Sequence, residues 1–396
     1  MIAIYLSPIY LLLNLYILRW AYLWMGTCHS ILRTLGFRLI FAVIYVLLST
    51  SLLTGFLIKN PKSLHRMLKI TGNYFLGIFL YTLVIILLAD FGRILLKYVF
   101  HASWIHSRTA FTVAGAICAL LILLLSACGI FHAKYIKTTS YDVIINKTIP
   151  ERTSMKVVLL ADTHFGYNAG VLHARELVRK INKQKPDLVC IAGDIFDNDY
   201  RAVRNPDKIA EILKGIKTKY GVYGCWGNHD VTETLLGGFS VHSAENNERD
   251  TRFEDLMKKS NVKILEDEAV LVDNKFYVVG RLDYEKTGKI GLERKTVHDL
   301  TENLDKTKPI IEIDHEPNEF DEKNDAGVDL DLGGHTHNGQ LFPGNITIKL
   351  AWENPWGIIK VGNMTNVTTS GAGVWGPNMR VGTNCEVAII NVKKGR

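Results

Sequence analysis

The chain has few of the residues and motifs that would assign it to a simple class of protein. Its six cysteines in 396 residues show no framework spacing, so a disulfide-stapled fold is not indicated. Cys190 and Cys225 lie in apolar runs and are interpreted as small core residues. The sequence has no internal repeat, low-complexity linker, P-loop or nucleophile elbow, which argues against solenoids, P-loop hydrolases and serine hydrolases.

Acidic residues are almost missing from the first third of the chain. Residues 1–140 contain 12 Lys and Arg but one acid, Asp90, whereas the remainder has 34 bases and 38 acids. The basic excess of the whole chain therefore belongs to the first third. The later part shows no clustered basic stripe, so no nucleic-acid partner is expected.

The same first third contains four long runs that are almost free of charge. They cover about residues 2–25, 38–58, 73–95 and 109–132. A bilayer core needs about 20 apolar residues per helix, and a signal peptide would explain the first run only. We therefore expect a four-helix membrane anchor over residues 1–140, with the lipid bilayer as a partner. Asp90 is the one acidic residue in these runs, and a single acid is not enough to line an ion pathway. This disfavours a transporter or channel.

The side of the membrane on which the later domain lies is suggested by the connections between these runs. The second connection, residues 59–73, carries four basic residues and is the most basic of the three. The positive-inside rule then predicts a cytoplasmic C-terminal domain, although a large domain can be exported regardless of this bias.

From residue 141 onward, short apolar runs alternate with amphipathic helical stretches. Strands are predicted within 156–164, 187–194, 220–230, 308–315, 327–337 and 384–392, and helices within 170–186 and 206–217. This order predicts an α/β (α+β) domain over residues 141–396. About 255 residues suit a two-layered β-sheet core flanked by helices.

Aspartate, histidine and asparagine residues follow these predicted strands. They are Asp162, His164, Asp194, Asn228, His229, His315, His335 and His337. Active sites of open α/β sheets gather at the carboxyl ends of strands, so these residues form one candidate site. Carboxylate, imidazole and amide oxygen suit Zn, Mn or Fe, whereas a structural zinc site would use thiolates. These donors are more than one tetrahedral ion can bind, and they suit two divalent ions that share a carboxylate, as in phosphoryl displacement.

The stretch LGGHTHNGQ (332–340) places two of these histidines one residue apart. In extended backbone, His335 and His337 would point to the same side and Thr336 to the other. Taken alone, this stretch is equally compatible with a solvated turn that carries two incidental histidines.

The ordered motifs D-x-H, GD, GNHD, a lone His and GHTH resemble the calcineurin-like metallophosphoesterase family over residues 155–392. GHTHNGQ and SGAGVWGPNMRVG (370–382) are similar to a bacterial membrane-associated branch, some of whose members hydrolyse pyrophosphate links in lipid precursors. One departure is Asn338, where that branch often has glycine, so the local loop geometry is open.

This resemblance implies a role for each residue. The first metal would be bound by Asp162, His164, Asp194 and His337, and the second by Asp194, Asn228, His315 and His335. His229 would act on the phosphate as an acid or an electrostatic clamp, with Asp194 and Asn228 in the same catalytic group. A hydroxide activated by the two metals would be the nucleophile.

The resulting hypothesis is a membrane-anchored phosphoesterase or pyrophosphate hydrolase of the bacterial inner membrane, whose phosphorylated substrate includes a lipid-linked one. The alternatives are hydrolysis of a soluble nucleotide or other small substrate, and a non-catalytic membrane receptor that kept the metal-binding shell. Missing ligands would mark such a receptor, and none is missing. The sequence leaves the oligomeric state open.

Several other residues are interpreted without a site role. Asp197, Asp199, Glu316 and His242 are expected in loops, His173 on a helix, and Trp352, Trp356 and Trp375 in the core of the β-domain. For the three tryptophans, an apolar wall beside a lipid substrate is the alternative.

Overall fold

The computed structural model describes residues 2–148, 154–233, 235–241, 250–285 and 292–395. Within these residues the chain forms two compact units. The first unit holds the N-terminal helices, a hairpin that begins at Leu235, and the segment Gly376–Met379. The second unit holds most of the chain after His132.

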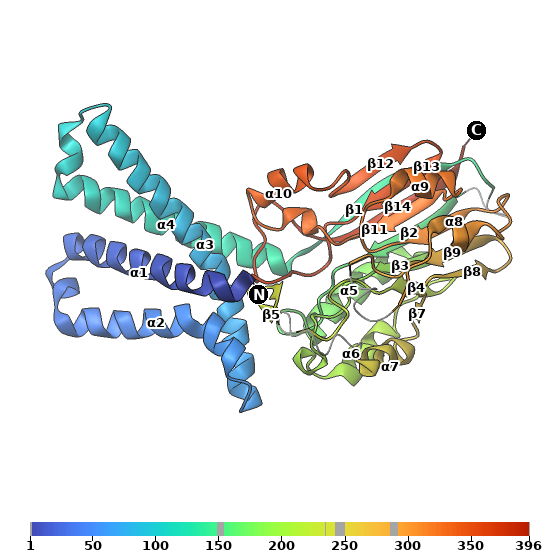
Figure 1. The fold of residues 1–396 in the computed structure, drawn as a ribbon, viewed down its shortest axis with the longest axis horizontal. Coiled ribbons are helices and arrows are strands. Elements are labelled where there is room, and N and C mark those ends of the chain that lie inside the picture. The colour runs from blue at the N-terminus through green and yellow to red at the C-terminus, as the bar shows by residue number, and fades with distance from the viewer. Residues whose placement is uncertain (1, 149–153, 234, 242–249, 286–291, 396) are drawn as a thin grey trace. The chain divides into compact units, whose positions relative to one another are not determined.

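The first unit is built on four long helices, coloured blue to teal in Figure 1. They are α1 (Ile2–Cys28), α2 (Leu35–Leu57), α3 (Lys62–Tyr98) and α4 (Arg108–Lys134), with short 3₁₀ turns η1 (Ser30–Arg33) and η2 (Ser103–His106). All four are long and apolar enough to cross a membrane, and between 17% and 22% of their most apolar stretches is buried. Most of their apolar surface thus faces outward, as expected for helices in lipid. Helix α3 is longer than the predicted span because it takes in most of the basic connection.

Two later segments belong to this helical unit. The hairpin of β5 (Leu235–Leu236) and β6 (Phe239–Ser240) packs beside α2, and Lys69 Nζ donates to the carbonyl of Leu235 at 2.9 Å. The backbone N–H of Asn378 donates to the carbonyl of Asn73 on α3 at 3.1 Å. The first unit is therefore assembled from three separate parts of the sequence.

The second unit contains two six-stranded mixed sheets. The first sheet has the order β1 (Ile136–Ile145), β14 (Cys385–Lys394), β2 (Ser154–Leu160), β3 (Leu188–Ala192), β4 (Val222–Cys225) and β7 (Lys263–Ile264). The second has the order β12 (Gly357–Val361), β13 (Met364–Thr368), β11 (Leu330–Gly333), β10 (Ile310–Ile313), β9 (Phe276–Gly280) and β8 (Glu268–Val272). Strands β2, β3, β4 and β7 run parallel, as do β9, β10, β11 and β13.

Strand alternation assigns each side chain to one of two cores. In β2, Val157 and Leu159 point into a core shared by the inner faces of both sheets, and Val158 and Leu160 point into the outer core of the first sheet. That outer core is covered by α5 (Val171–Gln184), α6 (Pro206–Leu213) and α7 (Thr251–Lys259). Helices α8 (Val297–Thr301) and α9 (Phe320–Asp325) cover the second sheet. The predicted two-layered β-sheet core flanked by helices is confirmed.

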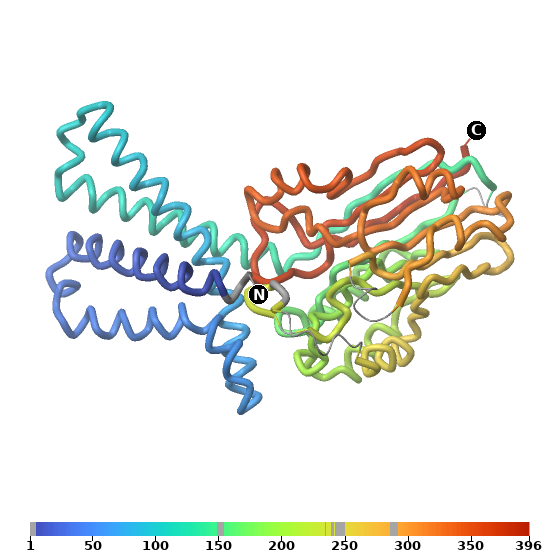
Figure 2. Tube along the Cα trace, viewed as in Figure 1, coloured from blue at the N-terminus to red at the C-terminus, as the bar shows by residue number. Residues whose placement is uncertain are grey.

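The N-terminal edge of this unit is strand β1. It pairs in parallel with β14 from Ile136 to Ile145, so the two segments lie side by side in Figure 2. Ile136 is buried in the outer core of the first sheet. The predicted domain boundary between residues 140 and 141 falls inside this strand.

Candidate metal centre

The candidate ligands lie just beyond the carboxyl ends of parallel strands from both sheets. Asp162, Asp194, His315 and His335 each stand two residues after β2, β3, β10 and β11, and Asn228 stands three residues after β4. The rigid strands thus position five separate loops, which carry these residues, at one edge of the domain. The structure brings all eight residues of the predicted site together at this edge.

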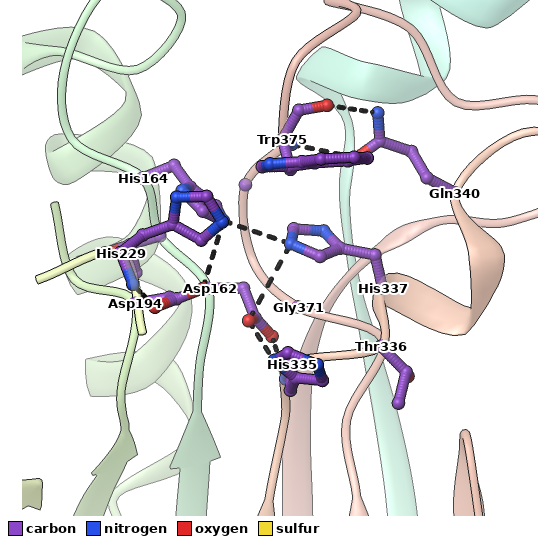
Figure 3. Close-up of polar contacts among 12 residues, drawn as sticks. Asp162, His164, Asp194, His229, His335, Thr336, His337, Gln340, Gly371 and Trp375 are labelled. Atoms are coloured by element: carbon purple, nitrogen blue, oxygen red, sulfur yellow. Dashed lines mark hydrogen bonds and ion pairs between the residues drawn. The ribbon is translucent and has the colours of Figure 1, made fainter. Parts of the chain in front are cut away.

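The first group of donors is formed by Asp162, His164 and His337. Their ligand atoms lie within 4.8 Å of one another. The Nε2 atoms of His164 and His337 are 3.0 Å apart, and Nε2 of His337 is 3.7 Å from Oδ1 of Asp162. Figure 3 shows the two imidazole rings turned toward each other. Two donors bound to one ion at about 2.1 Å lie roughly 3 Å apart, so this spacing fits a shared metal.

The second group centres on His315. Its Nε2 lies 3.3 Å from Oδ2 of Asp194, 3.1 Å from Oδ1 of Asn228 and 3.2 Å from Nδ1 of His335. Nδ1 of His315 contacts the carbonyl of Ala192 at 2.8 Å, which leaves Nε2 toward the site. The chemistry and spacing of these four donors fit a second divalent ion.

Two carboxylates connect the groups. Asp162 is common to the two clusters of mutually close ligand atoms, the second of which joins it to Asp194 and His315. Oδ2 of Asp194 lies 3.8 Å from Nε2 of His164 and 3.3 Å from Nε2 of His315. Oδ1 of Asp194 accepts the backbone N–H of His229 at 2.7 Å. The position of Asp194 between the two histidines is compatible with the bridging role predicted for it.

The pKa shifts of the site residues indicate that a positive charge would stabilise the site. Burial lowers the pKa of His164 and of His335 to about 3, so both rings are neutral, as metal ligands must be. Burial raises the pKa of Asp162 to about 7. Burial alone would lower the pKa of His315, but the carboxylates of Asp194 and Asp162 outweigh it and raise that pKa. Buried carboxylates of this kind are stabilised by a cation.

The backbone of the candidate ligands is strained. Five of them adopt a left-handed conformation, with φ of 53° at Asp162, 44° at His164, 49° at Asp194, 69° at His335 and 51° at His337. Non-glycine residues in this region cost of order 1 kcal/mol each, and such strain concentrates at functional sites. The strained backbone therefore lowers the stability of the fold, and it directs these side chains toward one point.

Glycines permit the close approach of the loops. A Cβ on Gly334 would lie 2.7 Å from Oδ2 of Asp162, and one on Gly193, whose φ is 71°, would lie 2.6 Å from Nδ1 of His315. Any side chain at either position would displace a candidate ligand.

The His335–His337 segment differs from the extended backbone expected from the sequence. His337 opens the 3₁₀ turn η5 (His337–Gly339), and both histidines have positive φ. Thr336 still points away, because its hydroxyl donates to the carbonyl of Pro355, and both rings face the site (Figure 3). Asn338 has a φ of 50°, a conformation that glycine adopts freely and asparagine tolerates better than most residues.

His229 is oriented by a partner that the motifs did not reveal. Its Nδ1 makes a short hydrogen bond with Oδ1 of Asn198. Nδ2 of Asn198 donates to the carbonyl of Val231 at 3.1 Å, so Oδ1 must face His229 and Nδ1 of His229 carries the proton. The His229 ring lies 5.3 Å from the ring of His164 and 6.3 Å from that of Trp375.

Arg380 is a second residue without a role in the sequence-based prediction. It is fully buried, and its guanidinium donates to the carbonyls of His337 at 3.1 Å, Ser370 at 2.6 Å and Gly373 at 2.8 Å. No carboxylate of the described chain forms an ion pair with it within 4.0 Å. Arg380 thus ties the His337 turn to the loop whose Gly371 packs against Asp162.

Several residues that were given no site role have different surroundings from those expected. Glu316 lies in a loop, as expected, but it is buried rather than solvated, and burial raises its pKa to about 8. Trp352 and Trp375 are half-buried beside the site, and the Trp352 ring lies 4.9 Å from that of His335. Trp356 is 44% exposed and donates to Glu386 at 2.9 Å, so it is not a core residue.

The remaining residues behave more simply. Cys190 and Cys225 are buried in strands, as predicted. Asp199 caps a 3₁₀ turn, η3 (Tyr200–Ala202), and His173 lies on α5 with its ring against Phe165. Asp197 approaches Nδ1 of His164 at 3.9 Å. His242 lies outside the described residues.

A family model for the calcineurin-like phosphoesterases matches residues 155–339, the range that contains every candidate ligand. Residues 155–339 are therefore a calcineurin-like phosphoesterase domain. Its buried His and Asp clusters are intact and fit the dinuclear metal site of a metal-dependent hydrolase.

Relatives occur in bacteria and animals. An uncharacterised metallophosphoesterase of Campylobacter jejuni is 29% identical over 248 residues, 61% of this chain and 60% of that protein. One from Aquifex aeolicus is 26% identical over 276 residues, 69% of this chain and 98% of that protein. A transmembrane protein with a metallophosphoesterase domain from Danio rerio is 28% identical over 274 residues, 65% of this chain and 57% of that protein. This chain's own four candidate spans make it a candidate integral membrane protein.

Proposed function

We propose that this chain is a membrane-anchored, metal-dependent hydrolase of phosphoester or pyrophosphate bonds that uses two divalent ions, with Mn, Zn and Fe as candidates. The observation that carries the proposal is the spacing of the donor atoms. Nε2 of His164 and His337 are 3.0 Å apart, and Nε2 of His315 lies between 3.1 and 3.3 Å from three further donors. No candidate ligand is missing, which disfavours a non-catalytic receptor.

The residues of the site would have separate roles in the reaction. Two ions held here would polarise the phosphate and lower the pKa of water to supply a nucleophile near neutral pH. Asp162, His164 and His337 would hold the first ion, and Asn228, His315 and His335 the second, with Asp194 between them. His229 would face the phosphate or its leaving group with Nε2, because Nδ1 is engaged by Asn198. It would then donate a proton or stabilise the developing charge.

For the substrate we favour a lipid-linked phosphate or pyrophosphate. Four candidate spans would hold the site near a bilayer surface. Trp352 and Trp375 offer half-buried aromatic surface next to the candidate ligand His335 and to His229, respectively, which suits an apolar group beside the phosphate. We also propose that the catalytic domain is cytoplasmic, because the connection around Lys62, Arg66 and Lys69 is the most basic of the three.

The test uses the full chain purified in detergent and loaded with Mn²⁺. We expect two ions per chain, chelator-sensitive hydrolysis of p-nitrophenyl phosphate or its diester, and faster turnover of a lipid pyrophosphate than of a nucleotide. Asp194→Ala should lose metal and activity together. A content of one ion or none after reconstitution would rule out the two-metal proposal, whereas preference for the nucleotide would overturn only the choice of substrate.

A further inference from the structure

A carboxylate outside every sequence motif contacts one of the candidate ligands. Glu285 lies on the chain that leaves β9, whose parallel neighbour β10 leads to His315. Oε2 of Glu285 accepts a hydrogen bond from Nδ2 of Asn228 at 2.8 Å. Glu285 itself is exposed, whereas Asn228 is buried. A solvent-facing acid therefore contacts a side chain inside the site.

This contact decides which end of the Asn228 amide faces the metal position. An ionised carboxylate accepts hydrogen bonds but donates none, so it selects the NH₂ end of the amide. The carbonyl oxygen must then point the opposite way, where Nε2 of His315 lies 3.1 Å from Oδ1. Only this oxygen can bind a cation, because a flipped amide would present two N–H groups to it.

The contact also affects the strength of the ligand. A hydrogen bond to a charged acceptor is stronger than one between neutral groups, and it polarises the amide so that more negative charge gathers on Oδ1. Residues that orient metal ligands in this way typically change metal affinity by about 10–100-fold when they are removed.

We propose that Glu285 is a positioning residue for the second metal ion, holding Asn228 with its oxygen toward His315 and His335. The proposal rests on the two-metal function described above. It predicts that the two ions respond differently to loss of Glu285, because this carboxylate contacts Asn228 of the second group. Among the described residues, it makes no hydrogen bond to the first group of donors, Asp162, His164 and His337.

The test is Mn²⁺ titration of the full chain in detergent, followed by electron paramagnetic resonance, which distinguishes isolated Mn²⁺ from a coupled pair. Glu285→Ala should bind the first ion as the wild type does and the second about 10–100-fold more weakly. Its coupled-pair signal should appear only at higher Mn²⁺. Glu285→Gln keeps an acceptor oxygen for Nδ2 of Asn228 and should restore most of the affinity for the second ion.

A charge-matched control is available on the same connection between β9 and α8. Glu293 is also an exposed acid, and Glu293→Ala should titrate like the wild type. In the absence of metal, the melting temperatures of all four proteins should be equal, because both glutamates are exposed. Two ions bound with unchanged affinity by Glu285→Ala, or a Gln variant no better than Ala, would overturn the positioning role. A wild type that binds a single ion would instead overturn the two-metal function itself.

Discussion

The backbone N–H of His229 donates to the carboxylate of Asp194, yet the side chains of the two residues have different surroundings. Asp194 lies between two candidate ligand histidines, whereas the His229 ring is held by Asn198 and lies near Trp375. A residue can therefore stand next to a ligand in sequence without binding metal. Asn228 and His229 are such a pair, because consecutive side chains diverge.

His229→Ala should keep both ions and lose turnover. If His229 is a general acid, the expected drop is about 10²–10⁴-fold. The loss should be greater for an alkyl phosphate than for p-nitrophenyl phosphate, since p-nitrophenolate leaves without protonation. Metal content and kcat for both substrates provide the measurement. An equal loss for both leaving groups, with two ions retained, would assign His229 an electrostatic role instead.

Arg380→Met should destabilise the second unit. The change leaves the carbonyls of His337, Ser370 and Gly373 without their charged donor, and hydrogen bonds to charged groups contribute about 1.5–3 kcal/mol each. Relief from burying a charge offsets part of this, so we expect a net loss of about 2–4 kcal/mol. Such a loss should lower the melting temperature by roughly 5–15 °C.

Arg201 provides the control for this substitution. Its side chain is 69% exposed and its carboxylate partner is Asp199, so Arg201→Met should leave the melting temperature unchanged. Arg380→Lys should fall between the wild type and Arg380→Met, because one ammonium cannot reach all three carbonyls. A melting temperature of Arg380→Met equal to that of the wild type would show that the buried guanidinium contributes nothing to stability.

At the scale of helices and strands, the sequence predicted where chemistry would gather. Short apolar runs between helical stretches identify β2, β3, β10 and β11. Residues that follow the carboxyl ends of these strands must share an edge when the strands are parallel. That argument depends only on local pattern and on sheet topology. It places the candidate ligands together without any knowledge of side-chain contacts.

Contacts made by irregular segments could not be predicted in this way. The turn at His337 and the burial of Glu316 depend on loops whose conformation has no periodic signal in the sequence. Arg380 and Glu285 are likewise single charged residues whose partners lie far away in the chain. Their roles follow from tertiary packing, which residue spacing does not encode.

Strand β10 carries a buried acid with a consequence for stability. Burial raises the pKa of Glu312 from an ordinary value of 4.5 to about 8, against the lowering effects of Lys323 and Arg281. The folded protein thus keeps a proton that the unfolded chain releases. This contribution to stability is complete below about pH 4.5 and is lost as the pH rises through about 8.

Glu312→Gln should remove this pH dependence, because glutamine has a similar shape and cannot ionise. The variant should match the wild type near pH 5 and melt at a higher temperature than the wild type near pH 9. Melting curves at both pH values give the result, with the exposed Glu302→Gln as the control for a change of charge. A constant difference between the Glu312→Gln variant and wild type across this range would contradict a raised pKa at Glu312.

At the scale of the whole chain, sequence order and spatial units do not coincide. The helical unit takes in the hairpin that begins at Leu235 and the segment Gly376–Met379. Within that unit, a Cβ on Gly77 would lie 2.4 Å from Sδ of Met379, so α3 and this segment pack closely. Trp375 and Arg380, which both contact site residues, flank the segment in sequence. Gly376–Met379 therefore packs on α3 within the helical unit, and the chain continues from both of its ends into the second unit.

Two shortened chains should separate these contributions. A chain of residues 136–396 keeps all of β1 and every candidate ligand, so it should fold and bind two ions. A chain of residues 141–396 loses half of β1, including the buried Ile136, and should melt several degrees lower. Both lack α3, whose Asn73 and Gly77 contact Asn378 and Met379, so both should turn over substrate more slowly than the full chain. Metal content, melting temperature and kcat on p-nitrophenyl phosphate, a soluble substrate that needs no membrane, measure each effect separately. Full turnover by the 136–396 chain would show that α3 serves only as an anchor.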